Sequence, residues 1–385
     1  MSTLEVRRPE MARLIADKLV ADPIFGSPSG LFLAAPRRTG KSTFLRKDLK
    51  PLLQERGMIV LYVDLWSNRR ADPGDLIAGS VKAGITDHGS AIQRFAKKFR
   101  IESLGMFGAS IDLGLESSTD GTISEAMRIL TASTEKDVVM IIDEAQQSLE
   151  SEAGLNAMFA LKAARDEVNQ GEDGRHLFLV MTGSHRDKLA ALVNGHKAPF
   201  YGAAVNVFPA LGREFSVAVA GQVNARLVES AHVSVDEVDE AFTVLGRKPE
   251  SLLFCVQSML TNTEFGPGVL RKIAQERKEA NDRANRAEIL SLTKLQRALL
   301  GMLYREGLEF SPFSDQSRNA LKSANGGRVP ATSAIQKAIN VLREKGLVWR
   351  PSHGSYALEN SELSGALDDL DIPVSEKDDL DDGPR

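Results

Sequence analysis

Residues 35–42 of the chain read Ala-Pro-Arg-Arg-Thr-Gly-Lys-Ser and follow directly on the apolar run Leu31–Ala34. A helical pattern from Thr43 to Glu55 comes next, so these eight residues form a loop between a strand and a helix. Backbone N–H groups in such a loop point at phosphates, and the dipole of the following helix adds positive potential there. We expect Lys41 to reach the terminal phosphates of a nucleotide and the Ser42 hydroxyl to ligate Mg²⁺.

The whole loop is expected to contact ATP, through Ala35, Pro36, Arg37, Arg38, Thr39, Gly40, Lys41, Ser42 and Thr43. Ala35 stands where the first glycine of such loops usually lies. A methyl group is tolerable there if the residue keeps a negative φ, while Gly40 retains the freedom needed next to the phosphates. The alternative is a chance match, against which the flanking strand and helix and a partner motif downstream argue.

The partner motif is the run Val138–Ile142 followed by Asp143 and Glu144. Five apolar residues in a row are typical of a buried central strand in a parallel sheet. Asp143 would end that strand beside the phosphate loop and hold the water shell of Mg²⁺. Glu144 would orient and deprotonate the water that attacks the γ-phosphate. The alternative is a helix that simply begins with acidic residues, which its dipole favours.

A third apolar strand, Leu177–Met181, ends in Thr182-Gly183-Ser184. A polar side chain at this strand end would hydrogen-bond the attacking water or the γ-phosphate. Thr182 and Ser184 both qualify as catalytic residues, and the sequence leaves the choice between them open. Ser184 also precedes a short helical pattern from His185 onward, so it is a candidate N-cap. Both roles are compatible, with Ser184 capping the helix and Thr182 sensing the nucleotide.

Further strands and helices alternate around these motifs, which is typical of a parallel α/β sheet. The expected elements are a helix at 10–20, a strand at 58–64, a helix capped by Asp72, a helix at 91–100, a β-hairpin at 101–116, a helix at 123–134 and a last strand at 203–208. The hairpin is interpreted as a plain edge hairpin, with a contact to a neighbouring subunit or ligand as the alternative.

A helical segment follows the sheet directly, in the position of a lid over bound ATP. Ser234–Leu245 is a capped amphipathic helix, the turn Gly246–Glu250 follows, and the next helix starts at Ser251. Arg247 lies at this helix junction and would reach the γ-phosphate. The alternative is a solvated turn residue, since exposed Lys and Arg are the rule.

The last domain reads as three helices and a two-stranded wing. The helices are expected at 293–305, 317–323 and 332–342, the third capped by Thr332 or Ser333, and a hairpin closes around a Pro-Ser-His-Gly turn. This is a winged helix-turn-helix, whose third helix enters the major groove of double-stranded DNA. The expected DNA contacts are Ser333, Gln336, Lys337, Asn340 and, on the wing, Arg350. Winged helices also bind protein partners, which is the alternative.

Composition fits a cytoplasmic protein. The chain has 385 residues and a single cysteine, Cys255, so no internal disulfide can form. No run approaches the roughly 20 apolar residues of a membrane span, so no membrane contact is expected. Residues 366–385 hold eight acidic and two basic residues, while the whole chain has a net charge of −4. This tail is expected to be disordered, and the rest of the chain is slightly basic.

Taken together, the loop at 35–42, the strand ending in Asp143-Glu144, the strand ending at Ser184 and the Gly246/Pro249 turn resemble AAA+-type ATPases. The nearest pattern is that of archaeal and STAND-related ATPases and origin-recognition-type initiators with a C-terminal winged helix. The resemblance implies an α/β P-loop NTPase fold with strand order 5-1-4-3-2 and ATP bound between core and lid. It divides the chain into a core at 1–212, a lid at 213–285, a winged-helix domain at 286–365 and the acidic tail at 366–385.

One departure concerns the arginine that such ATPases often place before the last strand, to contact ATP in a neighbouring subunit. No arginine occurs here between Arg186 and Arg213. Because such a finger is worth on the order of a thousandfold or more in rate, we expect slow hydrolysis, a substitute such as Lys197, or a finger such as Arg186. The sequence thus predicts an ATP-controlled switch that forms homo-oligomers on ATP binding and binds DNA. The alternative is a signalling or scaffold ATPase whose winged helix binds a protein partner.

Overall fold

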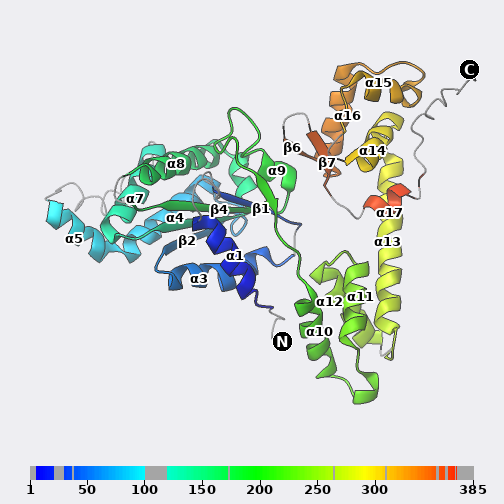
Figure 1. The fold of residues 1–385 in the computed structure, drawn as a ribbon, viewed down its shortest axis with the longest axis horizontal. Coiled ribbons are helices and arrows are strands. Elements are labelled where there is room, and N and C mark those ends of the chain that lie inside the picture. Colours follow the sequence, from blue (N-terminus) through cyan, green and yellow to red (C-terminus); the bar gives the residue numbers. More distant parts are fainter. Residues whose placement is uncertain are drawn as a thin grey trace, which may run out of the picture. The chain divides into compact units, whose positions relative to one another are not determined.

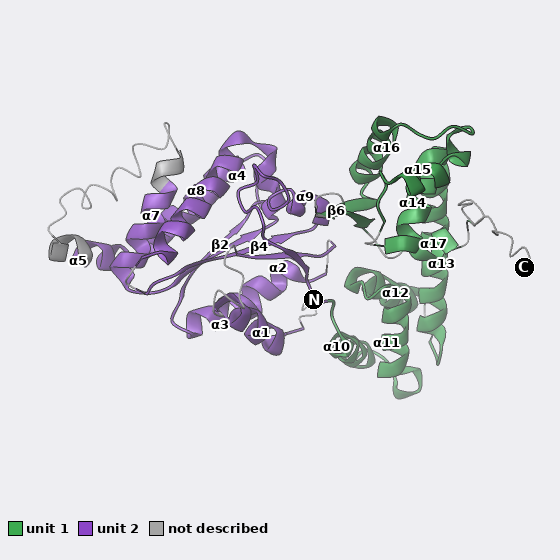
Figure 2. Cartoon of the chain, turned by 45° about the horizontal axis from the view of Figure 1, so that its top comes forward, with its two compact units in different colours: residues 1–4, 210–385 green, residues 5–209 purple. Residues whose placement is uncertain are grey.

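The computed structural model describes residues 6–20, 30–36, 39–99, 119–171, 174–262, 265–307, 310–352, 355–359, 363–368 and 370 (Figure 1). Contacts between residues divide the chain near residue 210 into two compact units, residues 5–209 and residues 210–385 with 1–4 (Figure 2). The first is called the ATPase unit below and the second the C-terminal unit. The expected hairpin at 101–116 and most of the acidic tail, as well as Arg37, Arg38 and His353, lie outside the described residues.

Five parallel strands form the sheet of the ATPase unit. They are β1 (Leu31–Ala34), β2 (Ile59–Asp64), β3 (Val138–Asp143), β4 (Leu177–Gly183) and β5 (Val205–Val207). Their order is β2-β3-β4-β1-β5, which confirms the expected order 5-1-4-3-2. All neighbouring pairs are parallel, so every strand ends at the same edge of the sheet. Loops that follow the strands therefore meet at that edge, where ligands bind in open α/β sheets.

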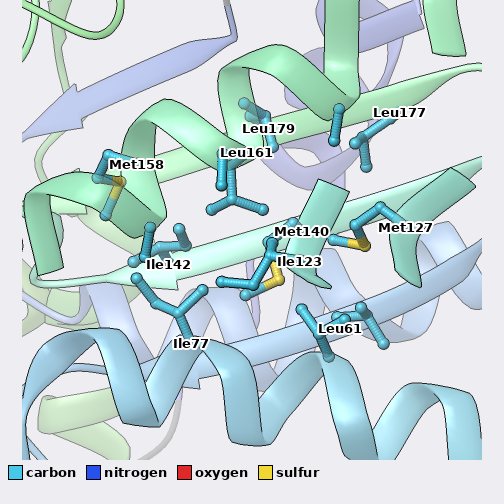
Figure 3. Packing of buried hydrophobic residues seen from close by; sticks show 14 of the residues in the cluster. Leu61, Ile77, Ile123, Met127, Met140, Ile142, Met158, Leu161, Leu177 and Leu179 are labelled. Atoms are coloured by element: carbon cyan, nitrogen blue, oxygen red, sulfur yellow. The ribbon is translucent and has the colours of Figure 1, made fainter. Parts of the chain in front are cut away.

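Both faces of this sheet are covered, because alternate residues of each strand point to opposite faces. On one face Leu61, Met140 and Leu179 belong to a core shared with the helices α4 (Pro73–Asp87), α7 (Thr119–Thr134) and α8 (Glu152–Asn169) (Figure 3). The other face packs Leu33 and Ile141 with α1 (Pro9–Val20) and with the helix that follows the phosphate loop. The near-continuous apolar runs of these strands reflect this two-sided burial.

The helix after the phosphate loop has three consecutive parts, α2 (Lys41–Phe44), a π-helical turn η1 (Leu45–Leu49) and α3 (Lys50–Glu55). A π-helical turn accommodates one extra residue and often marks a functional site. The carboxylate of Asp48 lies in this turn, buried, and accepts a hydrogen bond from Arg7 Nε at 2.6 Å. This pair fixes the segment before α1 to the helix of the phosphate loop.

Shorter elements complete the ATPase unit. They are α5 (Gly89–Phe99), η2 (Ala145–Glu150) and α9 (Arg186–Ala190). The helix that was expected to be capped by Asp72 is confirmed, since Asp72 Oδ1 accepts a hydrogen bond from Gly74 N at 2.7 Å. Across the parts of the chain listed above as described, no helix combines the length and the apolar character needed to cross a bilayer.

The C-terminal unit begins with a helical segment, residues 213–291. Its helices are α10 (Arg213–Asn224), η3 (Glu229–Ala231), α11 (Val235–Val244), α12 (Pro249–Asn262) and the 23-residue α13 (Val269–Ser291). Because α13 is continuous, the expected boundary between lid and winged helix at residue 285 falls inside one helix. The start of α13 packs against α11 and α12, and Ile289 near its end belongs to the core of the last segment.

The last segment forms the expected winged helix. It comprises α14 (Lys294–Glu306), α15 (Asp315–Ala320), η5 (Ser323–Asn325), α16 (Thr332–Glu344), the antiparallel strands β6 (Val348–Ser352) and β7 (Ser355–Leu358), and α17 (Leu363–Asp368). Two local expectations are wrong. The second helix begins at Asp315 and ends at Ala320, and Ser314 caps it. The N-cap of α16 is Ala331, without a side-chain cap bond, so neither Thr332 nor Ser333 caps that helix.

Packing of α4 on α8 gives a test with a matched control on one helix. A Cβ atom at Gly74 would lie 2.8 Å from the backbone C and O of Ala153, whereas one at Gly79 would meet nothing within 4 Å. We expect Gly74→Ala to destabilise the ATPase unit by about 1–3 kcal/mol through overpacking. Gly79→Ala should instead stabilise the unit by about 0.5–1 kcal/mol because alanine favours the helix. Urea unfolding measures both, and equal midpoints for the two variants would contradict this packing.

Candidate nucleotide site and candidate DNA-binding surface

The phosphate loop is fixed at its start by the sheet. Ala35 N donates to Gly183 O at 3.1 Å, which continues the pairing of β1 with β4. The described non-glycine residues with positive φ are Glu135, Glu144 and Arg247, so Ala35 keeps an ordinary backbone, as its methyl group requires. Gly40 has φ of +86° and N-caps α2, which confirms its expected use of the left-handed region.

Lys41 lies inside this loop. Its ammonium donates to Ala35 O at 2.8 Å and to Pro36 O at 3.1 Å, and the side chain is almost completely buried. Thr39 Oγ1 also donates to Pro36 O, at 2.8 Å. A buried ammonium needs acceptors, and here two loop carbonyls supply them. Phosphate oxygens are better acceptors for this cation, since a bond between two charged groups is the stronger one.

Two further expected contacts, Ser42 and Thr43, lie on the first turn of α2. Ser42 is half-buried and Thr43 is exposed. Both follow Gly40, so their backbone N–H groups belong to the helix N-terminus that favours anions. Arg37 and Arg38 stay predictions, because they lie outside the described residues.

Asp143 is the most constrained side chain at the carboxyl edge. It is fully buried and accepts hydrogen bonds from the Thr182 hydroxyl, from Tyr62 OH at 3.1 Å and from Glu144 N at 3.2 Å. The donors come from β4, from β2 and from the end of β3 itself. Three donors compensate for much of the cost of burying a carboxylate. Asp143 is therefore held in one orientation.

Tyr62 and its partners were missed by the sequence analysis. Arg46 Nε, on the helix of the phosphate loop, donates to Tyr62 OH at 2.9 Å, and Arg46 Nη2 donates to Asp64 Oδ2 at 3.0 Å. Burial raises the pKa of Tyr62 well above its ordinary value, and the charge of Asp143 raises it further, so the phenol keeps its proton and donates. The sequence offered one signal for this group of residues, because Asp64 is a second carboxylate at the end of a buried strand.

Asp64 lies directly beside Asp143, since the two are register partners at the ends of β2 and β3. Burial raises the pKa of Asp64. The neighbouring negative charges of Asp143 and Glu144 add to this effect, whereas Trp66 N–H and Arg46 oppose it. The edge of the sheet thus concentrates negative charge opposite the cationic loop, an arrangement suited to a divalent cation between protein and phosphate.

Glu144 has a left-handed backbone, with φ of +57°. Its Oε2 accepts hydrogen bonds from Gln146 Nε2 at 2.5 Å, from Ser184 Oγ at 2.7 Å and from Ser184 N at 3.3 Å. A non-glycine residue in this region is uncommon and costs of order 1–3 kcal/mol, which the surrounding structure must offset. Such strain is typical of functional sites.

The structure corrects one role considered for Ser184. The N-cap of α9 is His185, without a side-chain cap bond, so Ser184 does not cap that helix. Its hydroxyl binds Glu144 instead, and His185 Nδ1 lies 3.1 Å from the same oxygen. Thr182 is fully buried and its hydroxyl binds Asp143. The two candidate sensors thus contact different carboxylates, and which of them senses the nucleotide stays a prediction.

The donor set fits the expected Mg²⁺. Mg²⁺ prefers oxygen ligands and is usually held by one or two carboxylates together with substrate phosphates and waters. The Ser42 hydroxyl and the Asp143 carboxylate are such donors. Within the described part of the chain, no cluster of three or more His, Cys, Asp or Glu side chains could hold a metal ion alone. A cation here would accordingly depend on the phosphates of the nucleotide.

Arg247, the expected lid contact, belongs to the C-terminal unit. It follows α11 with φ of +53°, and its guanidinium donates to Asp239 Oδ2 at 3.3 Å and to Thr243 Oγ1 at 3.2 Å. Its guanidinium carbon also lies 5.5 Å from the ring centroid of Phe242. Arg247 is therefore ordered by its own unit, and its contact with a phosphate stays a prediction.

The expected DNA contacts on α16 share one face of the helix. Ser333, Lys337 and Asn340 are exposed and Gln336 is half-buried, while Ile335, Ala338, Ile339 and Leu342 on the opposite face are buried. Gln336 Nε2 donates to Asn340 Oδ1 at 2.9 Å, which orders two amides that have the chemistry to read an adenine edge. Arg350 lies on β6, in the wing.

The structure is similar to solved structures of other proteins. It matches the Walker-type ATPase Paby2304 of Pyrococcus abyssi at 18% sequence identity and a TM-score of 0.52, over 96% of this chain and 99% of that one. It also matches the ADP form of the ORC2 protein of Aeropyrum pernix at 13% identity and a TM-score of 0.50, over 96% and 95% of the two chains. No protein-family model and no curated protein matches the sequence.

At sequence identities this low, the comparison concerns the fold alone. The chain has the fold of the AAA+ P-loop ATPases, with a parallel α/β core followed by a helical region and a small C-terminal β-hairpin. This confirms the resemblance inferred from the phosphate loop and from the strands that end in Asp143 and Thr182. More particularly, its fold is like those of the Walker-type ATPase and the ORC2 protein named above.

Thr182 can be tested as a residue that positions Asp143. We expect Thr182→Val to weaken Mg²⁺-dependent ATP binding about ten- to a hundredfold, the usual cost of losing a hydrogen bond to a metal ligand. Thr182→Ser keeps a hydroxyl and should stay close to the native protein. Titration of Mg²⁺ at a fixed ATP concentration measures the effect. Equal Mg²⁺ dependence of the valine and serine variants would show that this hydrogen bond does not orient Asp143.

Proposed function

We propose that the protein is an ATPase switch that binds ATP with Mg²⁺, hydrolyses it slowly and engages double-stranded DNA through α16. The observation that carries the proposal is the meeting of the phosphate loop, Asp143 and Glu144 at one edge of a parallel sheet. This is the constellation that phosphoryl transfer requires, since its catalysis is mainly positioning and charge stabilisation. The helical region and winged helix that follow supply a second surface for the nucleotide to control.

In the proposed mechanism, Lys41 exchanges the carbonyls of Ala35 and Pro36 for oxygens of the β- and γ-phosphates. Ser42 and Asp143 would hold Mg²⁺, which would neutralise part of the phosphate charge when bound. Glu144 takes a proton from the attacking water while the water oxygen bonds to the γ-phosphorus. The bond from that phosphorus to the β–γ bridging oxygen breaks, ADP leaves, and the proton passes to the released phosphate. Thr182 and Tyr62 keep Asp143 in position throughout.

Slow basal turnover is expected for two reasons. Glu144 Oε2 is engaged by Gln146 and Ser184, and these donors must be exchanged before that oxygen can accept a proton from water. The chain also offers no arginine between Arg186 and Arg213. Arg186, at the start of α9, and the exposed Lys197 are the candidate substitutes within that stretch. A homo-oligomer formed on ATP binding would bring one of these cations, or another, to a neighbouring site.

A second candidate function follows from the chemistry of α16. Three of the four expected DNA contacts on this helix are uncharged, namely Ser333, Gln336 and Asn340, so the face suits protein contact as well as DNA. In that case the protein is a signalling or scaffold ATPase whose winged helix binds a protein partner. Salt dependence separates the two, because phosphate contacts make DNA affinity fall steeply with salt.

The nucleotide site is tested with two variants and a control on the same helix. Lys41→Met should abolish ATP binding, because the buried ammonium is the direct partner of the phosphates. Glu144→Gln should keep ATP binding but lower turnover at least about a hundredfold, since it removes the base. The control is Lys47→Met, at an exposed position of η1. Calorimetry and phosphate release measure these effects, and turnover that persists in Glu144→Gln would rule out Glu144 as the base.

The DNA surface is tested by removing one charge. Lys337→Ala should weaken duplex binding and reduce the slope of log affinity against log salt by about 1, as expected for one lost phosphate contact. Lys272→Ala, at an exposed position of α13, removes the same charge away from α16 and should leave the slope unchanged. Fluorescence anisotropy at several salt concentrations provides both numbers. Duplex binding that neither responds to salt nor changes in Lys337→Ala would favour the protein-binding alternative.

A further inference from the structure

A second concave site lies on the edge of the sheet that holds the nucleotide motifs. It is a polar pocket of about 480 Å³ in the ATPase unit. Its walls include Trp66 and Arg69 from the segment after β2, Gln147 and Glu150 from η2, and His185 and Lys188 from the start and body of α9. None of the described residues of the phosphate loop lines it. The volume falls within the range of small-molecule sites, and the proposed hydrolysis does not use it.

The wall after β2 carries a flat composite surface. The guanidinium carbon of Arg69 lies 4.1 Å from the ring centroid of Trp66, so the two groups stack. Trp66 is half-buried and Arg69 is exposed. Aromatic rings and arginine planes are the surfaces on which unpaired nucleobases stack, with little dependence on sequence. In a duplex the bases are already stacked and paired, so only a single strand can offer one to this wall.

The opposite wall supplies charge and polar groups. Lys188 Nζ lies 3.5 Å from Glu150 Oε1 in an exposed pair, which is worth little and is readily exchanged. The pocket lining therefore holds two cations, Arg69 and Lys188, against the single carboxylate of Glu150. A phosphodiester beside Lys188 would balance this excess, and Gln147 adds a polar group suited to a base edge.

We propose that this pocket binds one nucleotide of a single-stranded nucleic-acid segment, with its base on Trp66 and Arg69 and its phosphate at Lys188. The proposal extends the proposed function, since it makes nucleic acid a ligand of the ATPase unit as well as of the winged helix. The site is separate in the chain from α16, so each can be tested without the other.

The pocket is connected to Glu144 by hydrogen bonds. Ser184 Oγ has one proton, which it donates to Glu144, so His185 Nδ1 is the donor in its contact of 3.1 Å with Ser184 Oγ. Gln147 N, on another wall, donates to Glu144 O at 2.9 Å. A strand that draws His185 away frees the Ser184 hydroxyl to turn from Glu144, which removes one of the donors that must be exchanged before the carboxylate can accept a proton from water. Binding of a strand in the pocket therefore raises ATP turnover, and His185 is the residue that positions Ser184.

The sequence holds two tryptophans, Trp66 in the pocket and Trp349 on β6 of the wing. Trp349→Phe leaves Trp66 as the only indole, so its emission reports pocket occupancy directly. Titration of this full-length variant with oligo-dT of about 12 nucleotides, within the site size of single-strand binders, should give a saturable change. Adding Arg69→Ala and Lys188→Ala should weaken the fitted affinity roughly tenfold or more. Arg128→Ala, an exposed arginine of α7, is the matched control and should have no effect.

The second measurement is ATP turnover with and without oligo-dT. The Arg69→Ala and Lys188→Ala variants should keep basal turnover and lose the stimulation. His185→Phe lacks the contact with Ser184 and should keep strand binding, with a raised basal turnover that the strand does not raise further. General loss of structure would not give this combination. The proposal is overturned if Trp66 emission does not change, if the change survives in the double variant, or if dTMP gives the change and the oligonucleotide does not.

Failure of the winged-helix proposal would look different. Duplex binding in the Trp66→Phe variant, measured by gel shift, depends on Lys337 if α16 reads DNA and is absent if it does not. A response of Trp66 to oligo-dT without any duplex binding would remove α16 from nucleic-acid binding and leave the pocket standing. Duplex binding without a Trp66 response would rule out the pocket as a nucleic-acid site and leave the proposed role of α16 standing.

Discussion

A fully buried carboxylate, Asp143, sets the geometry of the carboxyl edge of the sheet. A buried charge without partners is strongly destabilising, so the Asp143 carboxylate requires hydrogen-bond donors around it. The Thr182 hydroxyl, the Tyr62 phenol and the Glu144 N–H provide them. Because these donors come from β4, β2 and the end of β3, the strand ends must keep one register, and a slip of one residue would move each donor to the other face.

This constraint extends to the phosphate loop. Arg46 on the helix after the loop donates to Tyr62 and to Asp64, so the helix and the ends of β2 and β3 are connected by hydrogen bonds. The loop itself is joined to β4 through Ala35 and Gly183. Lys41 and Glu144, the two groups with the most direct chemistry, both contact other protein groups. In the proposed function, a nucleotide that enters the site would therefore replace bonds that the protein already makes, as is expected of a switch.

The C-terminal unit has a different basis for order. Its winged helix is built around one apolar core that draws on the end of α13, on α14 and α16, and on Leu363 and Leu367 of α17. Packing of Ile335 and Ile339 into this core leaves Lys337 and Asn340 facing outward. The recognition surface proposed here is thus a consequence of helical periodicity, since the residues that the core does not use are the ones available to a partner.

Sequence alone determined the main features of the ATPase unit. Local signals identified the phosphate loop and the Asp143-Glu144 strand, because a strand, a loop with Gly40 before Lys41, and a helix are contiguous in the chain. The strand order came from the resemblance to AAA+ ATPases, and the sheet confirms it. Periodicity was enough for α16, whose buried and exposed residues alternate as a helix requires. The N-caps of two helices were predicted wrongly. They are Ala331 and His185, although residue types that cap better lie one position away.

Only the tertiary structure decided which side chains meet at the carboxyl edge. Thr182, Tyr62 and Arg46 are far apart in sequence, and only the parallel register of β2, β3 and β4 brings the first two to Asp143. Nothing in the local sequence predicts the left-handed backbone of Glu144 or the hydrogen bond that its carboxylate accepts from Ser184. Ser184 belongs to the end of another strand, which only the folded sheet brings close. The pocket lined by Trp66, Arg69 and Lys188 is of the same kind, since it forms where the segment after β2, η2 and α9 converge. Local sequence specifies single elements, whereas side-chain contacts between distant segments require the packed sheet.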